Sequence, residues 1–305
     1  MAHSVSLREA FDEFIADKKY QGVSPATISF YARNWYHFVR DTGVESVADL
    51  SPGVIRSWLL AHQGVTATTL ATYDRSLRVT LNWFEKHGYV AESPMKQLPK
   101  RRTPRTTVDT FTLAEAQAII RVAKAGRHPR RDVALVTLLL DTGLRIGEAI
   151  GLRLDDVDWV ESYVHATGKT GPRVVPVGRR AKAALKLYVD RERKASSPRI
   201  RKLFLTRSGD PLSVDAGCQQ VSKLVRGAGA AVRKAGPHTF RHTFAVEFIR
   251  AGGDAFTLQR LLGHSTLDMT RRYVHLADTD LRTAHRRFAV ADAWLGAASA
   301  GPQRG

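Results

Sequence analysis

A basic, proline-containing segment at residues 93–110 divides this chain into two parts. Each proline fixes its own φ and disfavours helix in the residue before it. The three prolines of the segment are Pro94, Pro99 and Pro104. Five cations lie among them: Lys96, Lys100, Arg101, Arg102 and Arg105. We therefore predict an extended linker between two domains. Its cations either contact phosphates or are simply exposed to solvent on a connecting segment.

Four amphipathic helices with short connections are predicted in residues 1–92. Ser6 and Glu9 have the spacing of a capping box before the first helix, and two later Ser-Pro pairs provide an N-cap followed by proline. The fourth helix is expected from about residue 66 to residue 88. Because such helices can bury their apolar faces only against each other, we predict a four-helix bundle whose aromatic residues form its core.

Residues 111–295 mix helices with one pair of short strands. Strand patterns at 157–165 and 173–177 flank the turn 168–171, which predicts a small antiparallel sheet. Helices are expected at about 131–140, 179–194, 214–233, 239–251, 255–262 and 267–290. The predicted fold class is therefore mainly α, in two domains, with an α+β second domain. Residues 296–305 are rich in Ala and Gly and are expected to form a disordered tail.

The charge of the chain indicates a polyanionic partner. The formal net charge is +18; residues 1–100 hold 11 Lys+Arg and 10 Asp+Glu, and residues 101–305 hold 36 and 19. This asymmetry predicts nucleic-acid binding mainly by the second part. The single cysteine, Cys218, excludes an intrachain disulfide and a Cys-based zinc site. No apolar run predicts a signal peptide or a membrane span, so we expect a cytoplasmic, nucleoid-associated protein with no membrane partner.

Arginines, histidines and a tyrosine gather in a few short motifs. They are Thr-Gly-Leu-Arg-Ile-Gly-Glu ending at Glu148, His238-Thr-Phe-Arg-His, Leu-Gly-His264 and Arg-Arg-Tyr273-Val-His. Together they supply guanidinium groups to clamp a phosphodiester, imidazoles to move protons and a phenol to attack phosphorus. The first and last histidines of His-Thr-Phe-Arg-His are four positions apart, as in the zinc-binding helix of metalloproteases. That motif requires Glu at the second position, where this chain has Thr239. We predict no metal site and no cofactor.

These motifs resemble those of the tyrosine recombinase (phage integrase) family, especially its shorter Xer-like members. The catalytic set of that family is Arg, Lys, His, Arg, His and Tyr, in that order. The matching positions here are Arg145, Lys169, His238, Arg241, His264 and Tyr273. The tyrosine follows the last histidine by nine positions, and the resemblance covers nearly the whole chain. It implies a SAM-like core-binding, DNA-binding domain at 1–92 and a catalytic domain with a C-terminal tail helix at 111–295.

The resemblance also implies a role for each matched residue. Arg145 and Arg241 would bind the nonbridging oxygens of the phosphate, and His264 would donate a further hydrogen bond. Tyr273 would be the nucleophile, with His238 as the candidate base that takes its proton. Lys169 would protonate the leaving 5′ oxygen. Glu148 and His242 are expected to support the site rather than perform chemistry.

The implied function is site-specific DNA recombination through a 3′-phosphotyrosyl intermediate. The protein would act as a tetramer on two duplexes that carry a specific core site, alone or with a related recombinase. A type IB topoisomerase-like enzyme and a catalytically inactive DNA-binding regulator are the alternatives. Because all six catalytic positions are present, an inactive regulator is disfavoured. The family-like helical domain before the linker disfavours a topoisomerase-like enzyme. The first helix begins at once, which leaves no room for an arm-binding domain and favours a Xer-like, transposon or plasmid resolvase role over arm-dependent integration.

Overall fold

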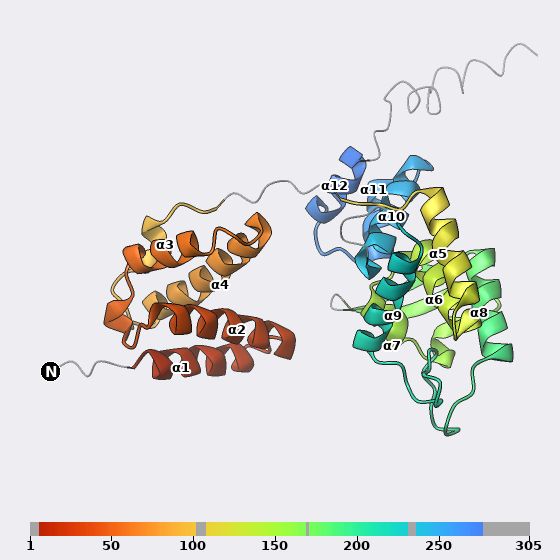
Figure 1. The fold of residues 1–305 in the computed structure, drawn as a ribbon, viewed down its shortest axis with the longest axis horizontal. Helices are drawn as coiled ribbons and strands as arrows, with labels where there is room; N and C mark the ends of the chain where they lie inside the picture. The colour runs from red at the N-terminus through yellow and green to blue at the C-terminus, as the bar shows by residue number, and fades with distance from the viewer. Residues whose placement is uncertain (1–5, 102–107, 169–170, 231–235, 277–305) are drawn as a thin grey trace, which may run out of the picture. The chain divides into compact units, whose positions relative to one another are not determined.

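The protein consists of two separate units, shown in a computed structural model (Figure 1). The structure describes residues 6–101, 108–168, 171–230 and 236–276. The chain divides into Met1–Thr106 and Thr107–Gly305, so the division falls inside the predicted 93–110 linker. The first unit is helical, and the second adds a small antiparallel sheet to its helices. The predicted fold class is thereby confirmed.

The first unit is a bundle of four helices around an aromatic core. The helices are α1 (Leu7–Tyr20), α2 (Pro25–Thr42), α3 (Pro52–Ala61) and α4 (Ala67–Lys86), with a short turn of 3₁₀ helix, η1 (Val47–Asp49), between α2 and α3. The predicted capping box of Ser6 and Glu9 starts α1. Phe11 stacks on Trp35 with ring centroids 4.9 Å apart, and both side chains are buried. These aromatic side chains therefore belong to the core, as predicted.

The beginning of the predicted linker belongs to the bundle instead. Pro94–Gln97 forms a 3₁₀ helix, η2, and Met95 is fully buried in the core of the first unit. The guanidinium of Arg78 on α4 donates hydrogen bonds to the backbone carbonyls of Met95 and Leu98. The prolines correctly indicated a break from α4, but the apolar side chains between them bury themselves against the bundle.

The second unit places its helices around α6. Its helices are α5 (Leu113–Ala125), α6 (Pro129–Thr142), α7 (Ile146–Gly151), α8 (Arg179–Arg191), α9 (Val214–Gly227), α10 (Pro237–Arg250), α11 (Ala255–Leu262) and α12 (Asp268–Leu276), with a 3₁₀ turn, η3 (Leu154–Asp156). α6 packs against α5, α8 and α10. Its sequence is mainly apolar, and Leu135, Leu138 and Leu139 are fully enclosed in the core.

A three-stranded antiparallel sheet carries the turn that holds the predicted lysine. The strands are β1 (Val157–Asp158), β2 (Tyr163–Gly168) and β3 (Gly171–Pro176), in the order β1-β2-β3. Gly168 pairs with Gly171 at the end of the two strands, and residues 169 and 170 lie outside the described residues. The single strand expected at 157–165 is instead two strands, because the chain reverses before Ser162, whose φ of 60° lies in the left-handed region.

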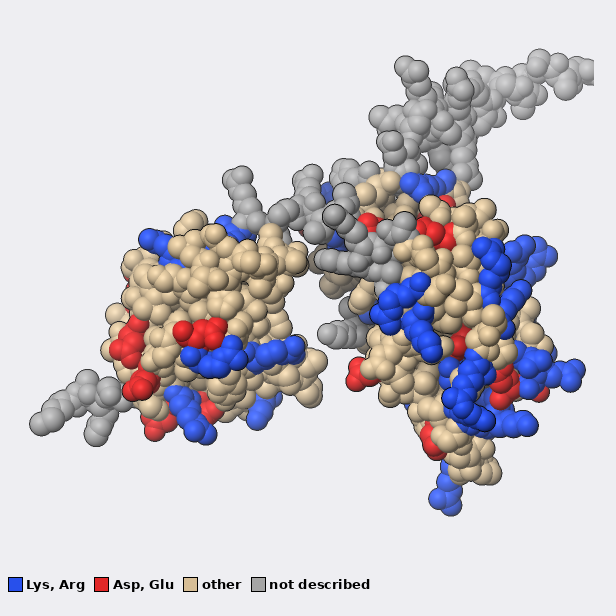
Figure 2. All heavy atoms as spheres, viewed as in Figure 1, with Lys and Arg blue, Asp and Glu red and all other residues tan. Residues whose placement is uncertain are grey.

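The surface of the second unit carries most of the positive charge, as the sequence predicts. Figure 2 shows Lys and Arg side chains spread over much of the visible face of this unit, whereas both signs of charge are present on the first. Within the described residues, no helix is both long enough and apolar enough to cross a bilayer.

Candidate active site

One buried carboxylate holds two of the arginines together. Glu148 on α7 is 5% exposed and accepts a hydrogen bond from Arg145 Nη1 at 2.9 Å. Arg173 on β3 binds the same carboxylate with both terminal nitrogens, at 3.0 and 2.8 Å. Burial alone would raise the pKa of Glu148, but the hydrogen bonds from Arg173 and Arg145 outweigh it and hold that pKa below its ordinary value. The carboxylate is therefore charged at neutral pH and orients both guanidinium groups.

The same carboxylate joins the β2–β3 hairpin to α7. Arg173 lies on the hairpin and also donates from Nε to the carbonyl of Leu261 at 2.8 Å. Gly168, the last residue of β2, lies so close that a methyl group added there would overlap Glu148 Oε1. Glycine is therefore required for the hairpin to approach α7. Lys169, the next residue, lies outside the described residues.

Arg241 is buried below these groups, on α10. It is 4% exposed, and its terminal nitrogens donate to the carbonyls of Gly143 at 2.9 Å and Leu262 at 2.7 Å. Burial, with the nearby positive charge of Arg145, lowers the pKa of Arg241 to about 10, so it remains a cation at neutral pH. Gly143 has a φ of 61° and ends α6, and any side chain there would overlap Phe244 and Leu262. The turn after α6 therefore brings a carbonyl to the guanidinium.

Tyr273 lies on α12 with its side chain enclosed. The residue is 3% exposed and packs in a cluster with Ala245, Val246, Leu258 and other apolar side chains of α10 and α11. Its hydroxyl and Nδ1 of His242 are 2.9 Å apart, within hydrogen-bond distance. Burial raises the pKa of Tyr273, although the positive charges of Arg241, Arg272 and Arg145 oppose this effect. The phenol thus lies within the electrostatic influence of the buried arginines.

Two neutral histidine rings lie next to Tyr273: His242 is within hydrogen-bond distance of its hydroxyl, and His264 lies nearly parallel to its ring. Burial lowers the pKa of His242 to about 4 and that of His264 to about 4, and neighbouring arginines add to the effect. The ring of His264 is nearly parallel to that of Tyr273, with centroids 6.2 Å apart and an angle of 14°. His264 Nδ1 lies 2.9 Å from the hydroxyl oxygen of Thr270, which fixes the orientation of the ring.

His238, the candidate base, lies at the beginning of α10. Its pKa is lowered by burial and by the positive charges of Arg241 and Arg145. It is therefore grouped with the arginines, while the hydroxyl of Tyr273 is hydrogen-bonded to His242. The resemblance implied that His238 is the base that takes the phenol proton and that His242 supports the site. In the structure, His242 is the histidine within hydrogen-bond distance of the Tyr273 hydroxyl.

The predicted DNA-binding cations have different surroundings. Lys96 forms an ion pair with Glu85 of α4, so part of its charge is already compensated. Lys100 and Arg101 are exposed. Arg102 and Arg105 lie outside the described residues.

Two site residues were not predicted from the sequence. Arg173 was assigned only to a returning strand, although a basic residue two positions after the turn is a detectable signal. Thr270 was not singled out, and its contact with His264 depends on how α12 folds back.

Comparison with known proteins identifies the family. Residues 109–280 match the model of the phage integrase family. The chain is also 32% identical to the tyrosine recombinase XerD of Corynebacterium glutamicum over 87% of this chain and 92% of the relative. This protein belongs to the phage integrase family. It is a tyrosine-type site-specific recombinase similar to the Xer proteins.

Other relatives and solved structures agree with this assignment. The tyrosine recombinase XerC of Mycobacterium bovis is 32% identical, with 92% of this chain and 98% of the relative covered. The Tn1549 transposon integrase, solved in complex with transposon right end DNA, has a TM-score of 0.79 at 21% identity and covers 94% of this chain and 100% of its own. A lambda integrase dimer bound to a core site has a TM-score of 0.73 at 17% identity, over 87% and 97% of the two chains. These structures support the fold.

Proposed function

We propose that this recombinase cuts and rejoins DNA by attack of Tyr273 on a phosphodiester that is held by Arg145 and Arg241. The observation that carries the proposal is an excess of buried positive charge beside the phenol. The guanidinium groups of Arg145 and Arg173 share one carboxylate, Glu148, and the buried cation of Arg241 has only two backbone carbonyls as hydrogen-bond partners. Such a site is complementary to an additional anion. The transition state of phosphoryl transfer is such an anion, because negative charge is spread over the nonbridging oxygens of the phosphate.

Each arginine contributes in a different way. Arg173 uses its donors on Glu148 and Leu261, so it organises the site rather than binding DNA. Arg145 is held by one terminal nitrogen, and its side chain is 28% exposed, so part of it is open to a ligand. A hollow of about 550 Å³ is lined by residues that include Arg173, Arg260 and His264.

The proton of the phenol must leave before or during the attack. In its Nδ1–H tautomer, the neutral ring of His242 can donate to the Tyr273 oxygen and hold it in one orientation, which leaves the phenol proton free for another base. His238 or a bound phosphate oxygen would then take the proton, since His238 lies among the same arginines. Lys169 would protonate the leaving 5′ oxygen. The product is a 3′-phosphotyrosyl bond, which keeps the bond energy so that another 5′ hydroxyl can reverse the reaction.

The reaction is proposed to take place in a tetramer that joins two duplexes at specific core sites, with identical protomers or a related recombinase. The protein would work in the cytoplasm on the nucleoid. The solved integrase structures with DNA, one of them a dimer on a core site, support DNA as the partner of this fold. A topoisomerase-like enzyme would instead relax plasmids as a monomer, without a defined site.

A suicide substrate tests the chemistry. Tyr273→Phe removes only the hydroxyl, so we expect site-specific binding to remain and the covalent protein–DNA adduct on a nicked substrate to disappear. Tyr163→Phe, a tyrosine of β2 outside the cluster, is the matched control and should form the adduct normally. An adduct formed by the Tyr273 variant would overturn the assignment. Relaxation of a plasmid that lacks the core site would favour the topoisomerase-like alternative.

A further inference from the structure

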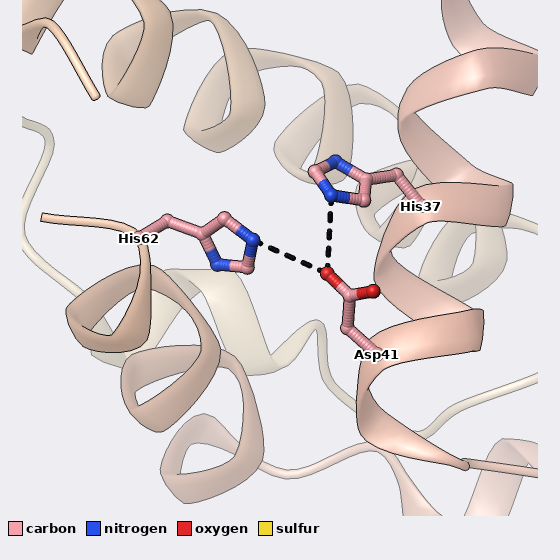
Figure 3. A group of neighbouring side chains, drawn as sticks. All are labelled: His37, Asp41 and His62. Atoms are coloured by element: carbon pink, nitrogen blue, oxygen red, sulfur yellow. Dashed lines mark ion pairs between the residues drawn. The ribbon is translucent and has the colours of Figure 1, made fainter. Parts of the chain in front are cut away.

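A second cluster of chemically active side chains lies in the first unit, which contains none of the matched catalytic residues. His37 and Asp41 are four positions apart on α2, and His62 is the residue at which α3 ends. Figure 3 shows both imidazoles directed at the same carboxylate. Among the residues that the structure describes, these are the side chains that come together as a possible three-ligand metal group, with all ligand atoms within 4.8 Å of one another.

The distances from the carboxylate oxygen to the two imidazoles suit a small divalent cation. Asp41 Oδ2 lies 3.1 Å from His37 Nε2 and 3.2 Å from His62 Nε2. Zinc bonds of about 2.0–2.1 Å in a tetrahedral site place neighbouring ligand atoms about 3.3 Å apart. The three side chains are 20–25% exposed, and Asp41 as a whole residue lies at the surface, so the group is open to an ion from solvent.

The orientation of His62 is the most informative detail. Its Nδ1 lies 2.8 Å from the backbone carbonyl of Trp58, and because a carbonyl can only accept, Nδ1 must carry the proton. Nε2 of His62 therefore faces the anionic carboxylate either with a second proton or with a lone pair. Something positive must lie between the two. Donation of the second ring N–H to a carbonyl is also the usual arrangement of histidines that ligate metals.

Crowding at Asp41 favours a metal ion over protons. The indole N–H of Trp58 already donates to Oδ2 at 3.1 Å, and Arg40 binds the other oxygen, Oδ1. With protons on both imidazoles, three N–H groups would share one oxygen that has two lone pairs. With a cation bound to the two imidazoles, Oδ2 would accept one hydrogen bond and coordinate one ion.

We propose that His37 Nε2, His62 Nε2 and Asp41 Oδ2 form a binding site for a divalent transition metal in the first unit. Two imidazoles and a carboxylate fit Zn²⁺ best among the abundant cations, with water at a fourth position. The ion joins the end of α2 to the end of α3. Its effect is therefore to stabilise the bundle, not to take part in DNA cleavage.

The test uses the full-length chain after treatment with a chelator. Co²⁺ is added while the visible absorption of four-coordinate cobalt is recorded, and Zn²⁺ binding is measured by calorimetry. His37→Gln and His62→Gln should each weaken binding by more than about 100-fold, since loss of a supporting partner alone costs 10–100-fold. Excess Zn²⁺ should raise the Tm of the first unit in the unaltered protein but not in these variants.

His87→Gln is the matched control. His87 ends α4 as His62 ends α3, and its Nδ1 lies 2.9 Å from the carbonyl of Trp83, four residues earlier. It does not belong to the candidate metal group of the described residues. This variant should therefore bind the metal as tightly as the unaltered chain.

Two results would overturn the proposal. The absence of any cobalt spectrum and of any heat with Zn²⁺ would show that protons alone bridge these groups. Binding that survives both the His37 and the His62 substitutions would place the ion elsewhere, for example at the histidines of the second unit. Should the variants fail to fold, nitrogen NMR of the unaltered chain decides, because Zn²⁺ must shift the Nε2 signals of His37 and His62.

Discussion

Replacement of Glu148 by glutamine should cost far more stability than the same change at an exposed Arg–Glu pair. Glu148 is buried and is the common anionic partner of Arg145 and Arg173. Glutamine keeps the shape but leaves the largely buried Arg173 and the partly exposed Arg145 without their counter-charge. Removing one partner of a buried ion pair costs about 3–5 kcal/mol. Because the amide oxygen can still accept one hydrogen bond, we expect about 3 kcal/mol.

Glu247 provides the comparison within the same unit. It pairs with Arg250 at the same spacing of three residues and a similar distance, 2.8 Å, but both side chains are about half exposed. Breaking an exposed pair costs about 0.2–1 kcal/mol. The free energy of unfolding of the second unit should therefore fall by about 3 kcal/mol for Glu148→Gln and by less than about 1 kcal/mol for Glu247→Gln.

Hydrogen exchange with mass spectrometry in increasing denaturant can measure both values, because peptides from the two units are separated. The Glu148 variant should also lose DNA cleavage, since Arg145 is no longer oriented. Equal losses of stability in the two variants would refute the argument that burial of the carboxylate makes it important. A loss of less than about 1 kcal/mol for Glu148→Gln would do the same.

Two further predictions concern the lysine and the histidines. Lys169→Ala should slow cleavage of an ordinary phosphodiester much more than cleavage of a 5′-bridging phosphorothiolate, because a thiolate leaves without a proton; equal slowing would assign the acid elsewhere. The pKa values of His242 and His264 are about 4 in the folded protein and about 6.5 when unfolded, so the unfolded chain binds more protons between these values. Stability should therefore fall as the pH drops from about 6.5 to 4 in urea denaturation, and His264→Gln should reduce this dependence.

Local signals in the sequence were sufficient for most of the helices and for the hairpin. The capping box of Thr112 and Glu115 starts α5 as its spacing suggests, and Gly43 ends α2 with a φ of 67°. These features depend on residues a few positions apart, so they can be recognised without the rest of the fold. The Gly-rich turn at 168–171 is another such case, since Gly168 and Gly171 close the hairpin.

Features that depend on distant parts of the chain could not be predicted in the same way. Arg173 reaches Glu148 across 25 positions, and His242 reaches Tyr273 across 31. The sequence showed that an Arg-x-x-Glu pair was present at Arg145, but it could not show that the carboxylate is buried or that it is shared. Likewise, Met95 and Leu98 look like parts of a linker until the bundle offers a surface to cover them.

The burial of the Tyr273 side chain has a consequence for nonspecific DNA binding. A chain with a net charge of +18 will collect on nucleic acid of any sequence, and most of those encounters occur away from a recombination site. Because the residue is only 3% exposed, a phosphate backbone that merely touches the surface does not meet the hydroxyl. If Tyr273 is the nucleophile as proposed, we expect DNA breaks only where an assembled complex brings the phosphate to this enclosed side chain.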